Sequence, residues 1–339
     1  MIQVDNLIKK YGGHTAVDQL SFTVEKGQIY GFLGPNGAGK STTMNIMTGY
    51  IAANSGTVKI NGYDILKEAE RAKQCIGYLP EIPPLYTDMT VREYLLFVAE
   101  LKKVPKKERK GHVNEVMGMT QIADVKDRLI KNISKGYKQR VGLAQALIGD
   151  PEVLILDEPM VGLDPKQIIE LRDLIKSLSE DHTIILSSHI LSEVSAICDH
   201  ILIISHGKLA ASGSPQELQE MMHTTTELEI TALGTKEHAE EILKKLDGIE
   251  SYEIESGQEA DSVKIRIQAA GDGDMRRELS ITLSKEGMPI LSMNRVEKSL
   301  EDIFLELTES EDDVDEDENM ADLPESEEKK EELGDGSDL

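Results

Sequence analysis

The sequence predicts an α/β protein in which helices cover a parallel sheet, followed by a small α+β unit. Three apolar runs indicate the sheet, at residues 29–33, 153–156 and 183–186. Each run is short and continuous rather than alternating, which is typical of strands buried on both faces. Because longer helical patterns lie between these runs, we expect residues 1–222 to form one large α/β domain.

A mostly helical subdomain is expected at about residues 90–147 of this domain. It opens with Thr-Val-Arg-Glu, which is the pattern of a capping box with Thr90 and Glu93 as the reciprocal pair. The positions that then share one helical face are Tyr94, Phe97, Val98 and Leu101.

A different pattern begins near residue 224. Apolar residues alternate at 228, 230 and 232 and again at 263, 265 and 267, as in half-exposed strands. Together with two helical stretches, they predict the order β-α-β-β-α-β over residues 224–308, which is a ferredoxin-like accessory domain. Ser299 is expected to cap a last helix, and the positions on its buried face are Leu300, Ile303, Phe304 and Leu307.

The chain is strongly acidic, with 62 Asp and Glu against 37 Lys and Arg in 339 residues, a net charge of -25. This balance argues against a general nucleic-acid binder, because phosphate contacts need clustered positive charge. Residues 309–339 alone hold 16 acidic residues and two lysines, with almost no large apolar side chains. We expect this acidic tail to be disordered.

The beginning of the chain lacks the basic start and apolar core of a signal peptide, and no stretch approaches the roughly 18 apolar residues of a membrane span. Two cysteines, Cys75 and Cys198, cannot form a disulfide framework and indicate a reducing compartment. We therefore expect a cytoplasmic protein that contacts a membrane only peripherally.

A glycine-rich motif directly follows the first apolar run and precedes a helical pattern. Its residues are Gly34, Pro35, Asn36, Gly37, Ala38, Gly39, Lys40, Ser41 and Thr42. This fits G-x-x-x-x-G-K-[ST] in the strand-to-helix context that a P-loop requires, which disfavours a glycine turn without a ligand. Backbone N–H groups and the helix N-terminus would bind phosphates, with Lys40 at the β- and γ-phosphates and Ser41 on Mg²⁺. The motif predicts nucleotide binding.

Two adjacent carboxylates, Asp157 and Glu158, follow the second apolar run. Asp157 is the candidate for holding Mg²⁺, directly or through water. Glu158 is the better candidate for polarising an attacking water molecule. Alone, such a pair is often an ordinary solvated strand end, but beside a P-loop it indicates hydrolysis.

Several further motifs resemble those of the ATP-binding cassette (ABC) ATPases over about residues 1–222. Residues 134–140 are similar to the family's signature sequence and residues 161–165 to its D-loop. His189 resembles the switch histidine, and Tyr11 the aromatic residue that stacks on adenine. Without the resemblance, residues 134–147 would be an ordinary capped helix and His189 a structural histidine.

The resemblance implies that two such domains pack head to tail, with each ATP between the P-loop of one copy and the signature of the other. It assigns catalytic roles to Lys40, Glu158 and His189. From the signature of the opposite copy, the nucleotide would be contacted by Ser134, Lys135 and Gly136. Asp164 of the D-loop is a further nucleotide-binding residue that the resemblance implies. The implied metal ligands are Ser41, Glu81 and Asp157.

The sequence departs from the common family pattern at two of these positions. Lys135 stands where a glycine is usual, and it either adds positive charge near the opposing γ-phosphate or is solvated. Glu81 stands where the family has Gln; it keeps an oxygen ligand and adds a carboxylate that favours a tightly bound cation. Both departures resemble the ABC-2-type exporter branch, as does the segment 299–308.

The branch implies an ATPase subunit that drives a separate ABC-2-type permease from the inner face of the membrane. Its partner would be a second copy or a related ATPase subunit, with no nucleic acid involved. A soluble ABC ATPase that regulates a macromolecular complex is the alternative, and a small-molecule kinase is a third hypothesis. Absence of a second cassette or a long coiled-coil insertion disfavours the soluble class.

Two weaker signals remain open. Residues 102–110 hold six basic residues and one acid, and they form either a solvated surface or a site near anionic lipid. Tyr86, Met89 and Tyr94 either line a groove for a helix of the permease or belong to the core.

Overall fold

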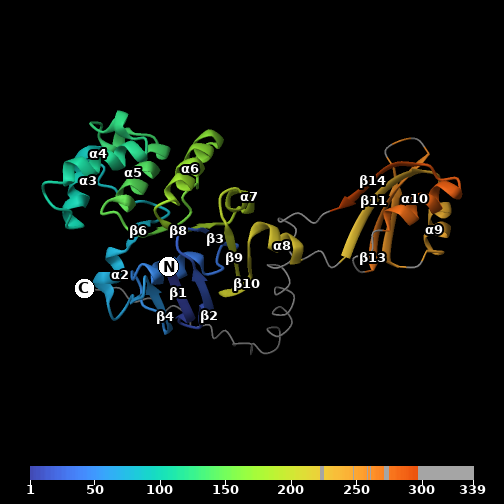
Figure 1. Ribbon diagram of the computed structural model, residues 1–339, viewed down its shortest axis with the longest axis horizontal. Coiled ribbons are helices and arrows are strands. Elements are labelled where there is room, and N and C mark those ends of the chain that lie inside the picture. Colours follow the sequence, from blue (N-terminus) through green and yellow to red (C-terminus); the bar gives the residue numbers. More distant parts are fainter. Residues whose placement is uncertain (222–224, 247, 258, 260, 271–274, 297–339) are drawn as a thin grey trace, which may run out of the picture. The chain divides into compact units, whose positions relative to one another are not determined.

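The computed structural model describes residues 1–221, 225–246, 248–257, 259, 261–270 and 275–296. Two sheets organise residues 1–221 (Figure 1). The antiparallel sheet has the order β2-β1-β4-β5, and its strands are β1 (Ile2–Tyr11), β2 (His14–Val24), β4 (Ser55–Ile60) and β5 (Tyr63–Asp64). The second sheet has the order β10-β9-β3-β8-β7-β6.

The strands of this six-stranded sheet are β3 (Ile29–Leu33), β6 (Ile76–Leu79), β7 (Val153–Leu156), β8 (Thr183–Ser188), β9 (His200–Ser205) and β10 (Lys208–Gly213). Along this order, the neighbouring strands from β9 to β6 pair in parallel. In this sheet, only β10 pairs antiparallel, with β9. All residues of β3, β7 and β8 are buried, so the predicted parallel core strands are confirmed.

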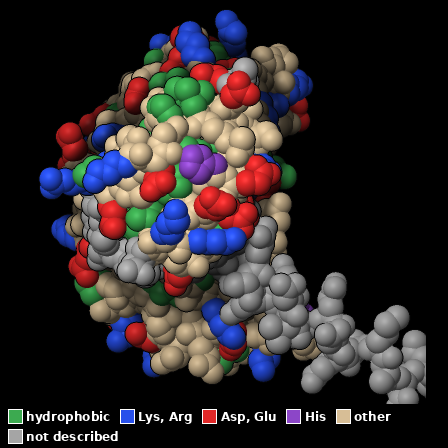
Figure 2. All heavy atoms as spheres, turned by 90° about the vertical axis from the view of Figure 1, so that its right-hand side faces the viewer, with side chains coloured by type: hydrophobic (Ala, Val, Ile, Leu, Met, Phe, Trp, Pro, Cys, Tyr) green, Lys and Arg blue, Asp and Glu red, His purple; other side chains and the backbone are tan. Residues whose placement is uncertain are grey.

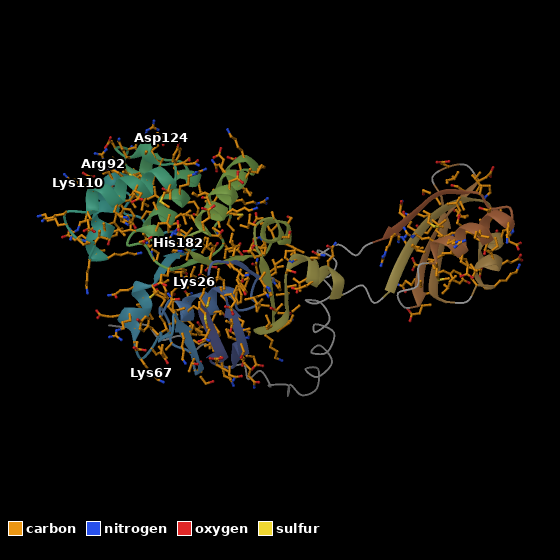
Figure 3. The ribbon with its side chains drawn as sticks, in the orientation of Figure 1. Lys26, Lys67, Arg92, Lys110, Asp124 and His182 are labelled. Atoms are coloured by element: carbon orange, nitrogen blue, oxygen red, sulfur yellow. The ribbon has the colours of Figure 1, made fainter. Side chains whose placement is uncertain are left out.

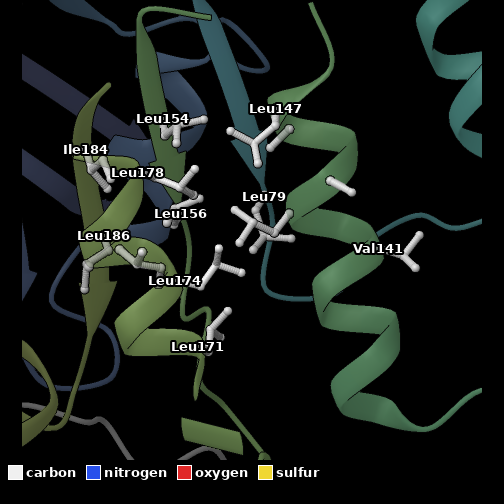
Figure 4. Close-up of a cluster of buried hydrophobic side chains, with 14 of the residues drawn as sticks. Leu79, Val141, Leu147, Leu154, Leu156, Leu171, Leu174, Leu178, Ile184 and Leu186 are labelled. Atoms are coloured by element: carbon white, nitrogen blue, oxygen red, sulfur yellow. The ribbon is translucent and has the colours of Figure 1, made fainter. Parts of the chain in front are cut away.

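The runs 29–33, 153–156 and 184–186 are continuously apolar or small because successive side chains enter two different cores. Leu154 and Leu156 pack into the core of the helical side, where Figure 4 shows them facing Leu174. Val153 and Ile155 pack on the opposite face, into the core shared with the antiparallel sheet. Burial on both faces is therefore the physical reason for the continuous apolar runs.

The helices of residues 1–221 are α1 (Lys40–Met47), α2 (Ala69–Gln74), α3 (Val91–Leu101), α4 (Arg109–Met119), α5 (Lys135–Leu147), α6 (Pro165–Leu178), α7 (Leu191–Ser195) and α8 (Pro215–Met221). Two short 3-10 helices, η1 (Ala123–Val125) and η2 (Ile130–Asn132), connect α4 to α5. The predicted helical stretch at 90–147 is thus present. None of the helices described is long and apolar enough to cross a lipid bilayer.

The capping box of α3 is confirmed. The Glu93 N–H donates to Thr90 Oγ1, and Glu93 Oε2 accepts from the Thr90 N–H at 2.9 Å. The predicted helical face is only partly buried, however. Tyr94 and Val98 are buried, whereas Leu101 is 63% exposed because it ends the helix at a surface cavity.

The second part of the chain has the predicted element order β-α-β-β-α-β. Its elements are β11 (Thr225–Leu233), α9 (Lys236–Leu243), β12 (Ile249–Ser256), β13 (Ser262–Ala270), α10 (Arg276–Lys285) and β14 (Ile290–Val296). The strands form an antiparallel sheet in the order β12-β13-β11-β14 around their own apolar core.

The domain boundaries at 222, 224 and 308 stay predictions. The last helix expected from Ser299 and the acidic tail lie outside the described residues. On the face shown in Figure 2, acidic and basic side chains are interspersed, as expected for a surface in water.

Candidate nucleotide-binding site

The glycine-rich loop connects the end of β3 to the start of α1. Gly37 and Gly39 have φ values of 87° and 99°, in the left-handed region that favours glycine. A Cβ atom on Gly39 would also overlap the carbonyl oxygen of Ala16. Glycine is therefore required here both by the backbone conformation and by the close approach of the strand β2.

Lys40 is buried at the floor of this loop, where its ammonium donates to Gly34 O at 2.7 Å and to Pro35 O at 3.1 Å. Its Nζ lies 3.8 Å from Glu158 Oε1. Burial lowers the pKa of Lys40, and the carboxylate of Glu158 opposes this shift. The cation is thus held in place by loop carbonyls, next to the position that phosphates would occupy.

The two carboxylates at the end of β7 have different partners. Asp157 Oδ1 accepts from Ser187 Oγ at 2.6 Å and from Ser41 Oγ at 3.4 Å. Both carboxylate oxygens of Glu158 lie 3.1 Å from His189 Nδ1. The structure therefore brings together Lys40, Glu158 and His189. Lys40 is more than a hundred residues away from the other two along the chain.

A cavity of about 440 Å³ lies at these groups. Its lining contains the predicted residues Tyr11, Asn36, Gly37, Gly39, Lys40, Ser41, Thr42, Glu81, Glu158 and His189. Gly34, Pro35 and Ala38 do not line it. The carbonyl oxygens of Gly34 and Pro35 accept hydrogen bonds from Lys40 instead. Asp157 faces an adjoining cavity that shares Ser41 and Glu81 with the first.

Sequence reasoning missed three lining residues, His14, Ala16 and Val161. No motif marks His14 or Ala16, which enter the site because β2 pairs with β1, with His14 opposite Tyr11. Val161 lies within the segment predicted to be the D-loop, so its proximity could have been anticipated. The sequence motifs do not single out Ser187, although its hydroxyl contacts Asp157 directly.

Four predicted nucleotide contacts lie elsewhere. Ser134 and Asp164 cap the N-termini of α5 and α6, accepting from the N–H groups of Tyr137 at 3.4 Å and Gln167 at 2.9 Å. Gly136 packs against the side chain of Gln167. Lys135 places its ammonium over Gly162, where a Cβ atom would overlap it. Within this chain, the described lining of the P-loop cavity contains none of the four.

The donor set at Ser41 and Asp157 fits Mg²⁺. This ion prefers hard oxygen ligands and is usually held by one or two protein side chains, with phosphates and water completing the shell. The hydroxyl and the carboxylate lie 3.4 Å apart, and Glu81 lines both cavities that meet there. Across the described ranges, no cluster of three or more His, Cys, Asp and Glu side chains could hold a metal by itself.

Comparison with known proteins identifies the family to which the chain belongs. A family model described as ABC transporter matches residues 17–161. The linearmycin resistance ATP-binding protein LnrL of Bacillus subtilis (strain 168) is 36% identical, over 91% of this chain and 98% of its own length. The chain belongs to the ABC transporter family of ATP-binding proteins.

Two more comparisons support this ABC assignment. The bacitracin transport ATP-binding protein BcrA of Bacillus licheniformis is also 36% identical, over 91% of this chain and 97% of its own length. A solved structure of an ATP-binding subunit of an ABC transporter is 28% identical with a TM-score of 0.60, covering 65% of this chain and 92% of that one.

This ABC protein is an ATP-binding transporter subunit and an ATPase. The resemblance noted in the sequence is confirmed. The transporter relatives favour this function over a soluble regulator of a macromolecular complex and over a small-molecule kinase.

Proposed function

We propose that this subunit closes head to tail with a second copy around ATP, and that hydrolysis then resets the pair to drive export through a separate permease. The observation that carries this proposal is the composition of the cavity. It contains the P-loop, Glu158 and His189, whereas Ser134 and Asp164 lie apart from it. Both of these residues are exposed at helix N-termini, which are suited to binding anions.

Within each closed site, different side chains of this subunit bind the phosphates, accept a proton and orient the base. Lys40 and the loop N–H groups bind the phosphates, and Glu158 accepts the proton of the attacking water as a general base. His189 holds the carboxylate of Glu158 in its orientation through the contacts at 3.1 Å. When bound at Ser41 and Asp157, Mg²⁺ would neutralise phosphate charge.

The adjoining cavity is the candidate docking site for a cytoplasmic segment of the permease. It has a volume of about 730 Å³, and its lining includes Tyr50 and Ile82, which are 80% and 81% exposed. Exposed apolar side chains beside a cavity favour contact with another protein. Glu81 and Ser41 belong to the lining of both cavities, so movement in one would reach the other.

Of the side chains Tyr86, Met89 and Tyr94, two belong to the core and one is exposed. Tyr94 is buried and its hydroxyl donates to Gln145 Oε1, and Met89 packs against the core. Tyr86 is 54% exposed. Of the three, Tyr86 alone is therefore available to a permease, and it lies against Tyr94 at 5.9 Å between ring centroids.

Export from the inner face of the membrane is supported by the two relatives, one named for resistance to linearmycin and the other for transport of bacitracin. The basic stretch near the groove is compatible with this position. Arg109 pairs with Glu100 at 3.1 Å, and Lys110 lies at the outer side of α4 in Figure 3.

The head-to-tail arrangement can be tested by mixing two inactive variants. Lys40→Ala removes the phosphate-binding ammonium and should lose nucleotide binding, while Ser134→Arg blocks the signature helix. In a mixed pair, one site carries both lesions and the other carries none. ATP turnover should therefore reappear on mixing, at about a quarter of the wild-type sites for random pairing.

Each variant measured alone is the control, and both should be inactive. Reappearance of turnover supports a composite site built from two chains. If the mixture stays as inactive as its components while both variants remain folded, then the site is completed within one chain and the proposal is wrong.

A further inference from the structure

Two adjacent serines end the strand β8 directly before His189. Ser187 and Ser188 are 0% and 2% exposed, and neither lines the P-loop cavity. Because side chains alternate along a strand, the two hydroxyls point to opposite faces of the sheet. They therefore cannot contact ATP in this arrangement, and their partners must be sought inside the protein.

Ser187 joins both acidic residues of β7. Its hydroxyl donates to Asp157 Oδ1 at 2.6 Å and accepts from the Glu158 N–H at 2.8 Å. A serine hydroxyl offers one donor and two acceptor positions, so one side chain can make both bonds. The link is possible because β7 and β8 are parallel neighbours, with Leu156 opposite Leu186.

The bond to the Glu158 N–H is made where the backbone is strained. Glu158 has a φ of 47°, in the left-handed region that residues other than glycine adopt rarely. Such a conformation persists when surrounding contacts hold it, and it is frequent at functional sites. Here the conformation turns the carboxylate of Glu158 toward His189.

Ser188 makes hydrogen bonds next to His189, as Ser187 does next to Glu158. Its Oγ accepts from the Ile190 N–H at 3.0 Å and donates to Glu193 Oε2 at 3.0 Å. Glu193 is buried in α7 and anchors this bond. The Ser188 hydroxyl thus joins the residue that follows His189 to α7 and holds the turn that carries His189.

We propose that Ser187 and Ser188 are positioning residues for ATP hydrolysis, which hold the Glu158–His189 pair in its reactive geometry. This inference rests on the proposed role of Glu158 as general base. Loss of either hydroxyl would leave the nucleotide-binding loop intact and loosen the two reacting groups. A displacement of about 1 Å in such a group lowers turnover by roughly 100-fold.

The primary test is Ser187→Ala, measured for ATP affinity, turnover and thermal unfolding. We expect ATP affinity to stay within about twofold and kcat to fall by roughly 10- to 100-fold. Ser205→Ala is the matched control, because Ser205 is also a buried serine of this sheet, and its hydroxyl has no hydrogen-bond partner among the described residues. That control should keep wild-type turnover.

A double variant separates positioning from general destabilisation. If Ser187 acts through Glu158, then adding Ser187→Ala to Glu158→Gln causes no further loss of residual turnover. Fully additive losses, or normal kcat in Ser187→Ala, would overturn the inference. Ser187→Cys has nearly the same shape with only a weak donor, and wild-type turnover in this variant would overturn it as well.

The same series distinguishes the two proposals. Normal turnover in Glu158→Gln alone contradicts the proposed role of Glu158 as general base. An inactive Glu158→Gln together with a fully active Ser187→Ala contradicts only the positioning role.

Discussion

At the scale of single residues, Glu81 is the clearest departure from the family pattern. Glu81 is exposed, and it lines both the P-loop cavity and the adjoining cavity. A glutamine there would offer the same oxygen without the charge. The carboxylate therefore adds negative charge next to Ser41 and Asp157, the two groups whose oxygens fit Mg²⁺.

We predict that Glu81→Gln keeps ATP turnover but needs more Mg²⁺. The half-maximal Mg²⁺ concentration should rise by about threefold or more, because fewer charged ligands weaken cation binding. Titration of ATPase activity with Mg²⁺ measures this shift. Asp88→Asn is a suitable control, because Asp88 pairs with Lys131 at 2.9 Å and lines neither cavity. Superimposable Mg²⁺ curves would contradict a role for the Glu81 charge.

At the scale of secondary-structure elements, the N-terminal caps decide where three helices begin. Thr90, Ser134 and Asp164 each accept a backbone N–H from the first turn of their helix. The caps satisfy donors that have no partner inside the helix. In α5 and α6 they also leave the helix N-terminus exposed toward solvent, where the proposed second copy would bind.

We predict that Thr90→Ala destabilises the chain by about 1 kcal/mol, which is typical for loss of a threonine cap. Urea unfolding of the wild type and the variant measures the difference. Glu93→Gln is the control, because glutamine can also complete a capping box. ATP affinity should not change, and a variant as stable as the wild type would show that this box does not support α3.

The same box gives a pH dependence. Hydrogen bonds from the Thr90 backbone and side chain lower the pKa of Glu93. A carboxyl group whose pKa is lowered by folding stabilises the folded state at pH values above its unfolded-state pKa. This stabilisation is lost as the pH falls through the lowered pKa of the folded state. The difference between wild type and Thr90→Ala should therefore shrink in acid.

At the scale of the whole molecule, the proposed pair implies that ATP binding and subunit association are linked. Closure of two copies is driven by ATP only when the ligand binds the closed state more tightly than the open one. Hydrolysis ends that preference. A variant that binds ATP without hydrolysing it should therefore accumulate as a pair.

We predict that Glu158→Gln nearly abolishes turnover and forms an ATP-dependent dimer, since amide nitrogen and oxygen cannot accept the proton of water as a carboxylate does. Light scattering should show the mass doubling from 37.5 kDa when ATP is added. Adding Lys40→Ala to this variant should abolish the dimer. A monomer at saturating ATP would speak against the closed pair.

The sequence by itself determined the parallel core, the nucleotide loop and the caps. Burial on both faces requires continuous apolar runs, so β3, β7 and β8 could be recognised from their residues alone. The glycine loop could likewise be recognised, because positive φ values at Gly37 and Gly39 restrict the residue type. These are local constraints, and a local constraint restricts the residue types at adjacent positions of the sequence.

Only the tertiary structure decided which distant groups share the site. His14 lies at the cavity because β2 pairs with β1, and Ser187 holds Asp157 and Glu158 because β8 lies in register beside β7. The sequence of a strand end is the same whether its serine hydroxyl is solvated or, as here, bonded to two residues that lie 29 and 30 positions away in the chain. Hydrogen bonds between strands depend on register and distance, which are properties of the folded chain.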